Sequence, residues 1–486
     1  MNQELKDYTP KLAHKLKFII MSLVGVFLFM VPIPFTNADG YRAFNIPLGF
    51  AIAWLGETIN ALDVNGFGLL FFVAAGVITI SFLGSAIAYI IKMIAYSILL
   101  ATSAEEPAAA LNARIEKLGP VIKLFLCSPL YFVSKAIAVA IVWMVFLGMG
   151  PDWLIASFTG DLMMDLISAG GSNLMSIFII LGITIPLLTD FGLMEFLGTL
   201  IRKVIRFLFT LPGRSSIDLL GSWFSSSAAS VIITRQQHEK GFYTDREAAA
   251  ICVNFTLVSL PFTFVIASTV GLMGHFPLFY LVITVTTILL AILMPRIWPL
   301  SRIKNEYLPD VGKQIDEEVP KGTSMFSWAV KSASRRAGQT GPNDVMKSGA
   351  SNWLNIFMDL IPVILAWGTI ALVLVEFTDI FDVLAWPFGW YMNILGVEGA
   401  FDYAPATIVG FIDMFIPAIL LGTEAPLATR FIIGALSIVQ IIYLAETGIL
   451  ILKSRIPLNI GHLAILFVMR TIIALPIIVL FAWLFL

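Results

Sequence analysis

Charge is what this sequence has least of. Only 13% of its 486 residues are Asp, Glu, Lys or Arg, and 58% are hydrophobic. A soluble globular chain carries about 25% charged residues. Too little polar surface remains here to cover a particle in water, so lipid must cover much of it. The composition predicts an integral membrane protein in contact with the lipid bilayer, and a net charge of −2 gives no reason to expect a nucleic-acid partner.

The residue types of metal sites and disulfides are scarce as well. The two cysteines, Cys127 and Cys252, lie in apolar runs and are expected to pack in helices rather than pair. The four histidines lack the spacing of metal ligands, and no Walker motif occurs. No serine has a recognisable histidine partner. These absences disfavour an ATP-driven pump, a metal centre and a hydrolase, so we expect neither enzyme activity nor a bound cofactor.

Long apolar runs are abundant. A spanning helix needs about 20 mostly apolar residues. The first run ends in Pro32–Phe35 rather than in the small residues of a signal-peptide cleavage site, so it reads as a span. Residues 43–62 include Glu57 and are expected to form an interfacial helix. About nine spans are predicted, at 18–36, 66–92, 121–149, 173–201, 247–273, 277–298, 351–376, 430–452 and 460–486.

Basic residues predict the topology. Lys11, Lys15 and Lys17 precede the first span, which places the N-terminus in the cytoplasm by the positive-inside rule. Residues 200–216 and the long loop 299–350 are rich in Lys and Arg and belong inside, whereas segments 37–65 and 151–172 are acidic and belong outside. Within the long loop, residues 326–336 are expected to form a short helix on the inner membrane surface. The sequence predicts a multi-pass protein of the cytoplasmic (inner) membrane.

Two shorter apolar runs complete this topology. No Lys or Arg occurs between residues 348 and 429, so the loops there belong outside. This agrees with the basic loops only if the runs 217–234 and 404–421 enter the membrane and turn back. Such backbone persists at membrane depth only where protein buries it or it lines a polar cavity. The predicted fold is therefore an all-α polytopic membrane protein with two re-entrant hairpins beside its spans.

The hairpins belong to two copies of one unit. Ile185-Pro186 and Ile361-Pro362 each open a helix, and a second proline follows after 26 residues in one copy (212 − 186) and 25 in the other (387 − 362). The first helix has a basic flank and the second an acidic one, which predicts inverted repeats. Inverted repeats with broken helices are typical of secondary transporters, whose site lies at the repeat interface. The expected domains are N-terminal scaffold helices at 1–172, a first repeat at 173–298, a cytoplasmic linker at 299–350 and a second repeat at 351–486.

The stretch Gly221–Ser230, with Thr244–Ala250 and Asn254, resembles the gate-domain or nucleoside-recognition-domain membrane proteins, and among them the YjiH-like group. The resemblance covers about 173–275 well and 351–470 more loosely. Related gate domains occur in concentrative nucleoside transporters, ferrous-iron permeases and spore-maturation proteins. The resemblance implies a membrane gate and solute passage without naming a substrate. Concentrative nucleoside carriers use acidic and amide residues in both hairpins, whereas the first hairpin here offers serines.

Polar side chains at the predicted breaks are the candidates for binding a solute. Serines interrupt the first hairpin, where they either bind the solute or allow close helix packing. The next helix carries an amide and two hydroxyls before Pro261, which frees backbone carbonyls; these residues line the site or join helices. The candidates in the first repeat are Ser225, Ser226, Ser227, Asn254, Thr256 and Ser259.

The second repeat offers ionisable candidates. Asp413 lies inside an apolar run, where a charge is a functional hypothesis by default; it binds solute or a coupling ion, or else is a neutral group or lies near the outer surface. Asp190 and Asp359 are similar ion-coupling candidates nearer helix ends. Gln440 and Glu446 are six residues apart, so both line one pocket only if their helix is broken between them.

The cation of the last span, Arg470, is expected to pair with Glu446 or Asp413, or to reach the interface. The function predicted from these patterns is secondary active transport of a small polar organic solute, either nucleoside-like or amino-acid- or peptide-like, coupled to sodium ions or protons. The alternative is a non-transporting gate-domain subunit or scaffold, partnered by a second gate-domain protein. A homo-oligomer fits either function, and the N-terminal helices would scaffold or dimerise.

Overall fold

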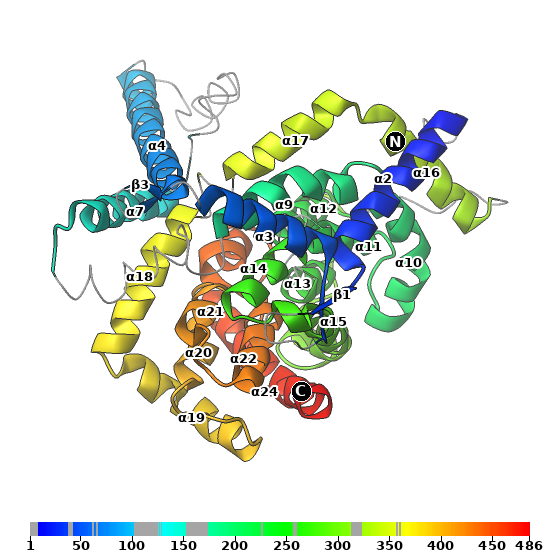
Figure 1. The fold of residues 1–486 in the computed structure, drawn as a ribbon. Coiled ribbons are helices and arrows are strands. Elements are labelled where there is room, and N and C mark those ends of the chain that lie inside the picture. Colours follow the sequence, from blue (N-terminus) through cyan, green and yellow to red (C-terminus); the bar gives the residue numbers. More distant parts are fainter. Residues whose placement is uncertain are drawn as a thin grey trace. The chain divides into compact units, whose positions relative to one another are not determined.

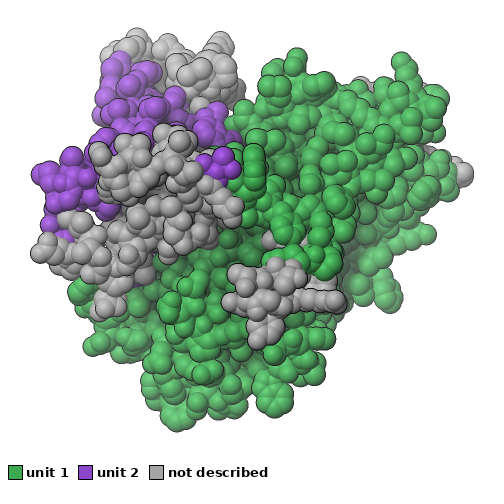
Figure 2. Space-filling view, in the orientation of Figure 1, with its two compact units in different colours: residues 1–55, 176–352, 374–486 green, residues 56–175, 353–373 purple. Residues whose placement is uncertain are grey.

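Helices make up most of this chain, as Figure 1 shows. The computed structural model describes residues 8–36, 42–60, 63–64, 67–101, 125, 127, 129–151, 174–224, 227–255, 260–312, 323–355, 358 and 361–486. Two compact units are coloured in Figure 2. Unit 1 comprises Met1–Leu55, Ser176–Asn352 and Leu374–Leu486, and unit 2 comprises Gly56–Met175 and Trp353–Val373. The all-helical prediction is confirmed.

Unit 2 is built around two apolar helices that pack against each other, α4 and α7. The Lys135 ammonium of α7 lies 3.2 Å from Ser85 Oγ of α4 and donates to it. The indole of Trp143 donates to Thr79 Oγ1 at 3.0 Å. Polar bonds of this kind join helices in lipid, where apolar contact alone does not favour association. The elements of this unit are β3 (Asp63–Val64), β4 (Phe67–Gly68), α4 (Leu69–Ala101), α7 (Pro129–Leu147) and most of α18 (Ile361–Phe377).

Unit 1 begins with the first predicted span, α2 (Leu12–Met30). It is followed by an antiparallel pair of short strands, β1 (Ile33–Thr36) and β2 (Arg42–Asn45), with Ile33 opposite Asn45. The helix α3 (Pro47–Asn60) follows, where the sequence predicts an interfacial helix. Apolar side chains on α2 such as Leu23 are exposed, as contact with lipid requires.

Two stretches of the chain then contain the same succession of elements. Each has an apolar helix, a second helix after a break, two short helices that pack against each other, an interrupted helix and a long final helix. The first stretch consists of α9 (Leu174–Thr189), α10 (Leu193–Phe209), α11 (Ser215–Phe224), α12 (Ser227–Glu239), α13 (Asp245–Asn254), α14 (Leu260–Thr269) and α15 (Phe276–Leu293). The second consists of α18, α19 (Ile380–Ile394), α20 (Ala404–Val409), α21 (Ile416–Leu421), α22 (Leu427–Val439), α23 (Ile449–Leu452) and α24 (Ile460–Phe485).

Helix breaks are more frequent than the sequence predicts. One span was expected over 173–201, but the chain bends by 57° between α9 and α10. Gly192 at this bend has φ 94°, and a Cβ atom there would lie 2.7 Å from the Cα atom of Ala333, so a side chain does not fit. The expected spans 247–273 and 430–452 are also interrupted, the first at Phe255, where α13 has ended, and the second after Gln440. Short 3-10 turns lie at η2 (Met273–His275), η3 (Met294–Arg296) and η4 (Leu300–Arg302), and a π-helical turn at η6 (Leu444–Gly448).

The region between the two stretches contains α16 (Met325–Gln339) and α17 (Pro342–Asn355). The predicted short helix is α16, which packs against α2 and α10. Its buried residue Ala333 forms a small core with Phe18 of α2 and Phe196 of α10. The expected cytoplasmic linker, residues 299–350, therefore contains α16 and most of α17.

Four described helices are long and apolar enough to cross a membrane, by length and composition, and the number rises to six if each bent pair counts as one span. The bent pairs are 179–189 with 193–209 and 361–375 with 380–394. Several candidate transmembrane helices are thus present, and the predicted number of about nine stays a prediction. The four single helices are Leu12–Met30, Ala75–Ala95, Met273–Arg296 and Ile460–Phe485.

Candidate functional site

The guanidinium of Arg470, in the middle of α24, is fully buried. Its Nη1 atom donates to the carbonyl of Val253 at 2.9 Å and to Asn254 Oδ1 at 2.8 Å. Its Nε and Nη2 atoms donate to the carbonyl of Val439 at 3.0 and 2.7 Å. No ion pair joins it to Asp413 within the described residues, so one of its two predicted carboxylate partners is replaced by backbone and an amide. The other, Glu446, lies in η6, and its side chain is outside the described part.

The two carbonyls bound by Arg470 lie at equivalent places. Val253 is the second-to-last residue of α13, and Val439 is the last residue of α22. The last carbonyls of a helix lack partners within it, and the bilayer interior offers no water in their place. Arg470 therefore supplies hydrogen-bond donors to terminal carbonyls of both interrupted helices.

An amide follows each of these carbonyls, at Asn254 and Gln440. Gln440 is fully buried, and its Nε2 atom donates to the carbonyl of Thr407 at 2.8 Å and to Thr471 Oγ1 at 2.9 Å. Its Oε1 atom is buried without a hydrogen-bond partner in the described structure. A lone buried acceptor costs about 1–3 kcal/mol, so this atom is open to a donor or a cation. We name Asn254, Thr407, Gln440, Arg470 and Thr471 the polar node.

Each pair of short helices contacts the interrupted helix that follows it. In the first stretch, the hydroxyl of Ser222 in α11 donates to the carbonyl of Phe255, directly after α13. In the second, the amide of Leu444 donates to the carbonyl of Phe411 at 2.9 Å, which joins the turn after α20 to the turn after α22. Each short-helix pair is thus bonded to the end of the helix segment that follows it.

Each short-helix pair also holds a buried carboxylate. Asp413 Oδ1 accepts the amide of Phe415 at 2.8 Å, and in the described structure this is its single hydrogen bond. Asp218 in α11 accepts the phenol of Tyr243. Sequence reasoning missed Asp218, although it lies inside the run 217–234 as Asp413 does inside 404–421. The expectation that the first hairpin offers only serines was wrong, because the rule applied to Asp413 applies equally to Asp218.

The remaining predicted residues have different positions. Ser227 is the first residue of α12 and is buried. Asp190 lies at the bend after α9, where its Oδ1 atom is 3.5 Å from Arg336 Nη2 of α16 and its carbonyl accepts Thr340 Oγ1 at 2.7 Å. Asp190 is therefore bonded to the linker helix and not to the polar node. The predicted residues outside the described part are Ser225, Ser226, Thr256, Ser259 and Asp359.

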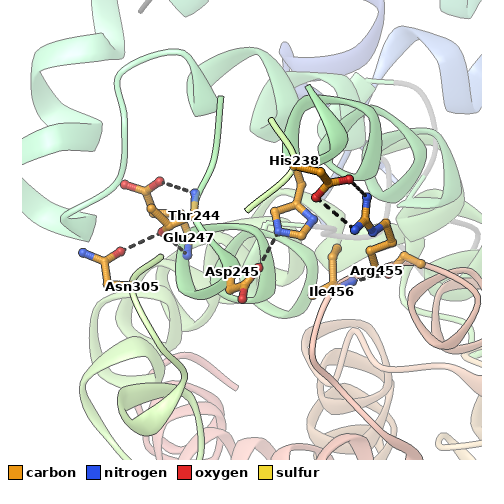
Figure 3. Close-up of polar contacts among 9 residues, drawn as sticks. His238, Thr244, Asp245, Glu247, Asn305, Arg455 and Ile456 are labelled. Atoms are coloured by element: carbon orange, nitrogen blue, oxygen red, sulfur yellow. Dashed lines mark hydrogen bonds and ion pairs between the residues drawn. The ribbon is translucent and has the colours of Figure 1, made fainter. Parts of the chain in front are cut away.

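A second polar cluster, shown in Figure 3, lies where α13 begins. Thr244 and Glu247 cap the helix reciprocally, and Thr244 Oγ1 lies 2.7 Å from Asn305 Oδ1. His238 Nε2 lies 2.7 Å from Asp245 Oδ1.

An exposed ion pair lies near this cluster, in the view of Figure 3. Arg455 binds both oxygens of Asp310, at 2.7 and 3.1 Å. Hydrogen bonds from the Arg455 guanidinium lower the pKa of Asp310. These contacts join the loop after α15 to the loop after α23. No group of three or more His, Cys, Asp or Glu residues that could hold a metal ion occurs among the described residues.

Apolar helices, two hairpin-like pairs and two interrupted helices that meet at a buried polar node define a transporter-like membrane protein. Residues 172–273 match the family described as Gate: Nucleoside recognition. An uncharacterized protein of Alkalihalophilus pseudofirmus is 40% identical over 485 residues, which are 99% of this chain and 96% of that protein. The chain belongs to the gate-domain membrane protein family, which is associated with transporters rather than enzymes. No solved structure matches it.

Proposed function

We propose that this chain is a secondary active transporter that carries a small polar organic solute across the cytoplasmic membrane, driven by sodium ions or protons. The observation that carries the proposal is the meeting of two interrupted helices at the polar node. Val253 and Val439 are 186 positions apart in the sequence (439 − 253), and so are Asn254 and Gln440 (440 − 254). The same succession of elements therefore places the same two groups, a terminal carbonyl and an amide, at the same buried point.

The repeats are proposed to be inverted, with the first running outward to inward and the second inward to outward. The charges at their flanks support this orientation, because Lys and Arg flank the first and are absent from 348–429. In carriers built this way, the substrate lies where the interrupted helices of the two repeats meet, near the middle of the membrane. The Oε1 atom of Gln440, which has no hydrogen-bond partner among the described residues, supports a polar solute at that place.

The proposed solute site consists of side chains at the breaks, and the solute is nucleoside-like or amino-acid- or peptide-like. The amides donate and accept, and the hydroxyls do the same, so together they suit hydroxyl, amide or base groups. Asp413 is the proposed coupling residue, because its carboxylate is buried and, in the described structure, accepts a single hydrogen bond, from a backbone amide. Residues proposed to line the site are Ser225, Ser226, Ser227, Asn254, Thr256, Ser259, Gln440 and Glu446, with Asp190 and Asp359 as further ion-coupling candidates.

Solute counterflow in proteoliposomes tests the proposal. The full chain is purified, and nucleosides, amino acids and dipeptides are screened first by thermal shift, since a solute at about 100 times its Kd stabilises the folded state by about 2.7 kcal/mol. We expect at least one solute to stabilise the protein and to show counterflow. Gln440→Leu should weaken binding, and the exposed Gln339→Leu in α16 should not.

A chain that binds no solute, shows no counterflow and copurifies with a second membrane protein would instead be a subunit of a gate-domain complex. Dependence of uptake on an imposed sodium gradient or an imposed proton gradient identifies the coupling ion. Currents that do not saturate with solute concentration would indicate a channel.

A further inference from the structure

We infer that Arg470 is a built-in cation that fills the position where the ends of α13 and α22 converge, a position that a free cation would otherwise occupy. Its three guanidinium nitrogens donate to Val253, Asn254 and Val439. Arg470 has this role whether or not the chain carries a solute.

Charge supports the assignment. The C-terminus of a helix carries about half a negative charge, so two converging C-termini supply about one. The guanidinium supplies one positive charge and remains charged in proteins. A charged side chain in the bilayer interior is costly unless it is paired or bound by backbone carbonyls. Among the described side chains, the two helix ends and the guanidinium therefore neutralise one another without a carboxylate.

The arrangement of the oxygens around Arg470 also supports the assignment of a built-in cation. Unwound carbonyls and half-helix C-terminal ends are the groups that bind sodium ions in transporters with broken helices. Here the carbonyl of Val439 already accepts two N–H groups, and that of Val253 accepts one. Asn254 is fixed by a second bond, from its Nδ2 atom to the carbonyl of Ala250 at 2.9 Å. These three oxygens, of Val253, Asn254 and Val439, are bonded to the guanidinium, so we expect a coupling ion to bind elsewhere.

Thermal unfolding of the purified full chain tests this role, with methylguanidinium as the probe. Arg470→Ala removes the cation and leaves both helix ends unsatisfied, and it should lower the unfolding midpoint by about 5 °C or more. Methylguanidinium should recover a large part of that loss. Sodium chloride in place of choline chloride should raise the midpoint of Arg470→Ala by more than that of the wild type, because the vacated oxygens accept a free cation.

Arg430 provides the matched control. Its Nη1 atom also donates to a carbonyl at a helix end, that of Val270 at 2.9 Å, but its side chain is only partly buried. Water replaces it there, so Arg430→Ala should show no recovery with methylguanidinium. Equal responses of Arg430→Ala and Arg470→Ala would show that methylguanidinium acts nonspecifically and would overturn the inference.

Two further variants separate charge from packing. Arg470→Lys keeps a positive charge and should unfold at a higher temperature than Arg470→Met, which keeps apolar bulk only. If Arg470→Ala cannot be purified from membranes, the comparison of Arg470→Lys with Arg470→Met tests the inference. A midpoint for Arg470→Met equal to or above that of Arg470→Lys contradicts a cation role, as does an Arg470→Ala variant that responds to neither methylguanidinium nor sodium beyond the wild-type response.

Discussion

The elements of the first series, α9 to α15, follow in the same order as those of the second, α18 to α24. The charged residues that the two series carry are different. In the final helix of the first, the hydroxyls of Thr286 and Thr287 are buried without hydrogen-bond partners in the described structure. In the final helix of the second, Arg470 binds the ends of both interrupted helices. A single cation from the second series therefore binds both helix ends, whereas the final helix of the first series carries small hydroxyls and no such cation.

The carboxylates differ in the same way. Asp218 of the first series accepts the phenol of Tyr243, and among the described residues Asp413 of the second accepts only a backbone amide. The more weakly satisfied carboxylate is the better candidate for binding and releasing an ion. We therefore expect Asp218 to support the structure of the first series, and the proposed ion coupling to depend on Asp413 of the second.

The largest expected effect is that of Asp413→Asn. The amide neither attracts a cation nor releases a proton, so gradient-driven uptake in proteoliposomes should fall by about tenfold or more, while solute exchange continues. Asp218→Asn should lower the unfolding midpoint and leave coupling intact. The exposed Asp402→Asn should change neither. Loss of coupling in Asp218→Asn with normal coupling in Asp413→Asn would reverse the assignment.

The glycines of the two short-helix pairs give the next effect. A Cβ atom at Gly410 would lie 2.5 Å from Gln440 Oε1. The Gln440 side chain cannot easily move away, because its Nε2 atom makes two hydrogen bonds. Gly410→Ala should therefore cost about 1–3 kcal/mol of folding stability and weaken solute binding. At Gly221 in α11 the nearest atoms are 3.8 and 3.9 Å away, so Gly221→Ala should be neutral or stabilising. Thermal unfolding of both variants measures the contrast.

A smaller effect is expected from Asn254→Ala, which removes one acceptor of Arg470. Hydrogen bonds between membrane helices contribute about 0.6 kcal/mol on average and about 1.7 at most, and the buried charge places Asn254 near the upper end. Thr287→Val removes a hydroxyl that has no partner in the described residues and should be neutral or stabilising. The outcome that contradicts this contrast is a larger fall of the midpoint in Thr287→Val.

The smallest effect concerns the exposed pair Asp310–Arg455. Because the folded-state pKa of Asp310 is lowered by Arg455, the pair stabilises the folded chain above the unfolded pKa of about 4, and this contribution is lost as pH falls through the lower folded value. Exposed pairs contribute little and are screened by salt. The midpoint difference between wild type and Asp310→Asn should be small at neutral pH and vanish in acid. A difference that grows as pH falls would contradict this.

Apolar runs were enough to locate most helices, and α24 matches the predicted span 460–486 nearly to the residue. The short-helix pairs in 217–234 and 404–421 were expected, because the charges of the flanking loops required the chain to turn back in both runs. The bend at 190–192 was missed, because hydropathy stays high through it and the information lies in the backbone of Gly192.

The candidate site was predicted in part. Asn254 and Gln440 were both selected as candidates for binding a solute, and both lie in the polar node. The break that Gln440 and Glu446 would need in order to share a pocket is present after Gln440. The partners of Arg470 were not predictable, because carbonyls carry no sequence signal and every residue has one. Asp218 was overlooked although its pattern was visible.

Ile441, directly after Gln440, has a φ angle of 64°. A β-branched residue in the left-handed region stores about 1–3 kcal/mol of backbone strain. Straightening α22 into a regular helix would release that strain, but it would return the Val439 oxygen to the amide of Tyr443, which now donates to Thr447 Oγ1. The guanidinium would then lose an oxygen that it holds twice. The break after Gln440 and the hydrogen bonding of the buried guanidinium thus depend on each other. The strained torsion of Ile441 persists because relaxing it would remove an acceptor from a cation in an apolar interior.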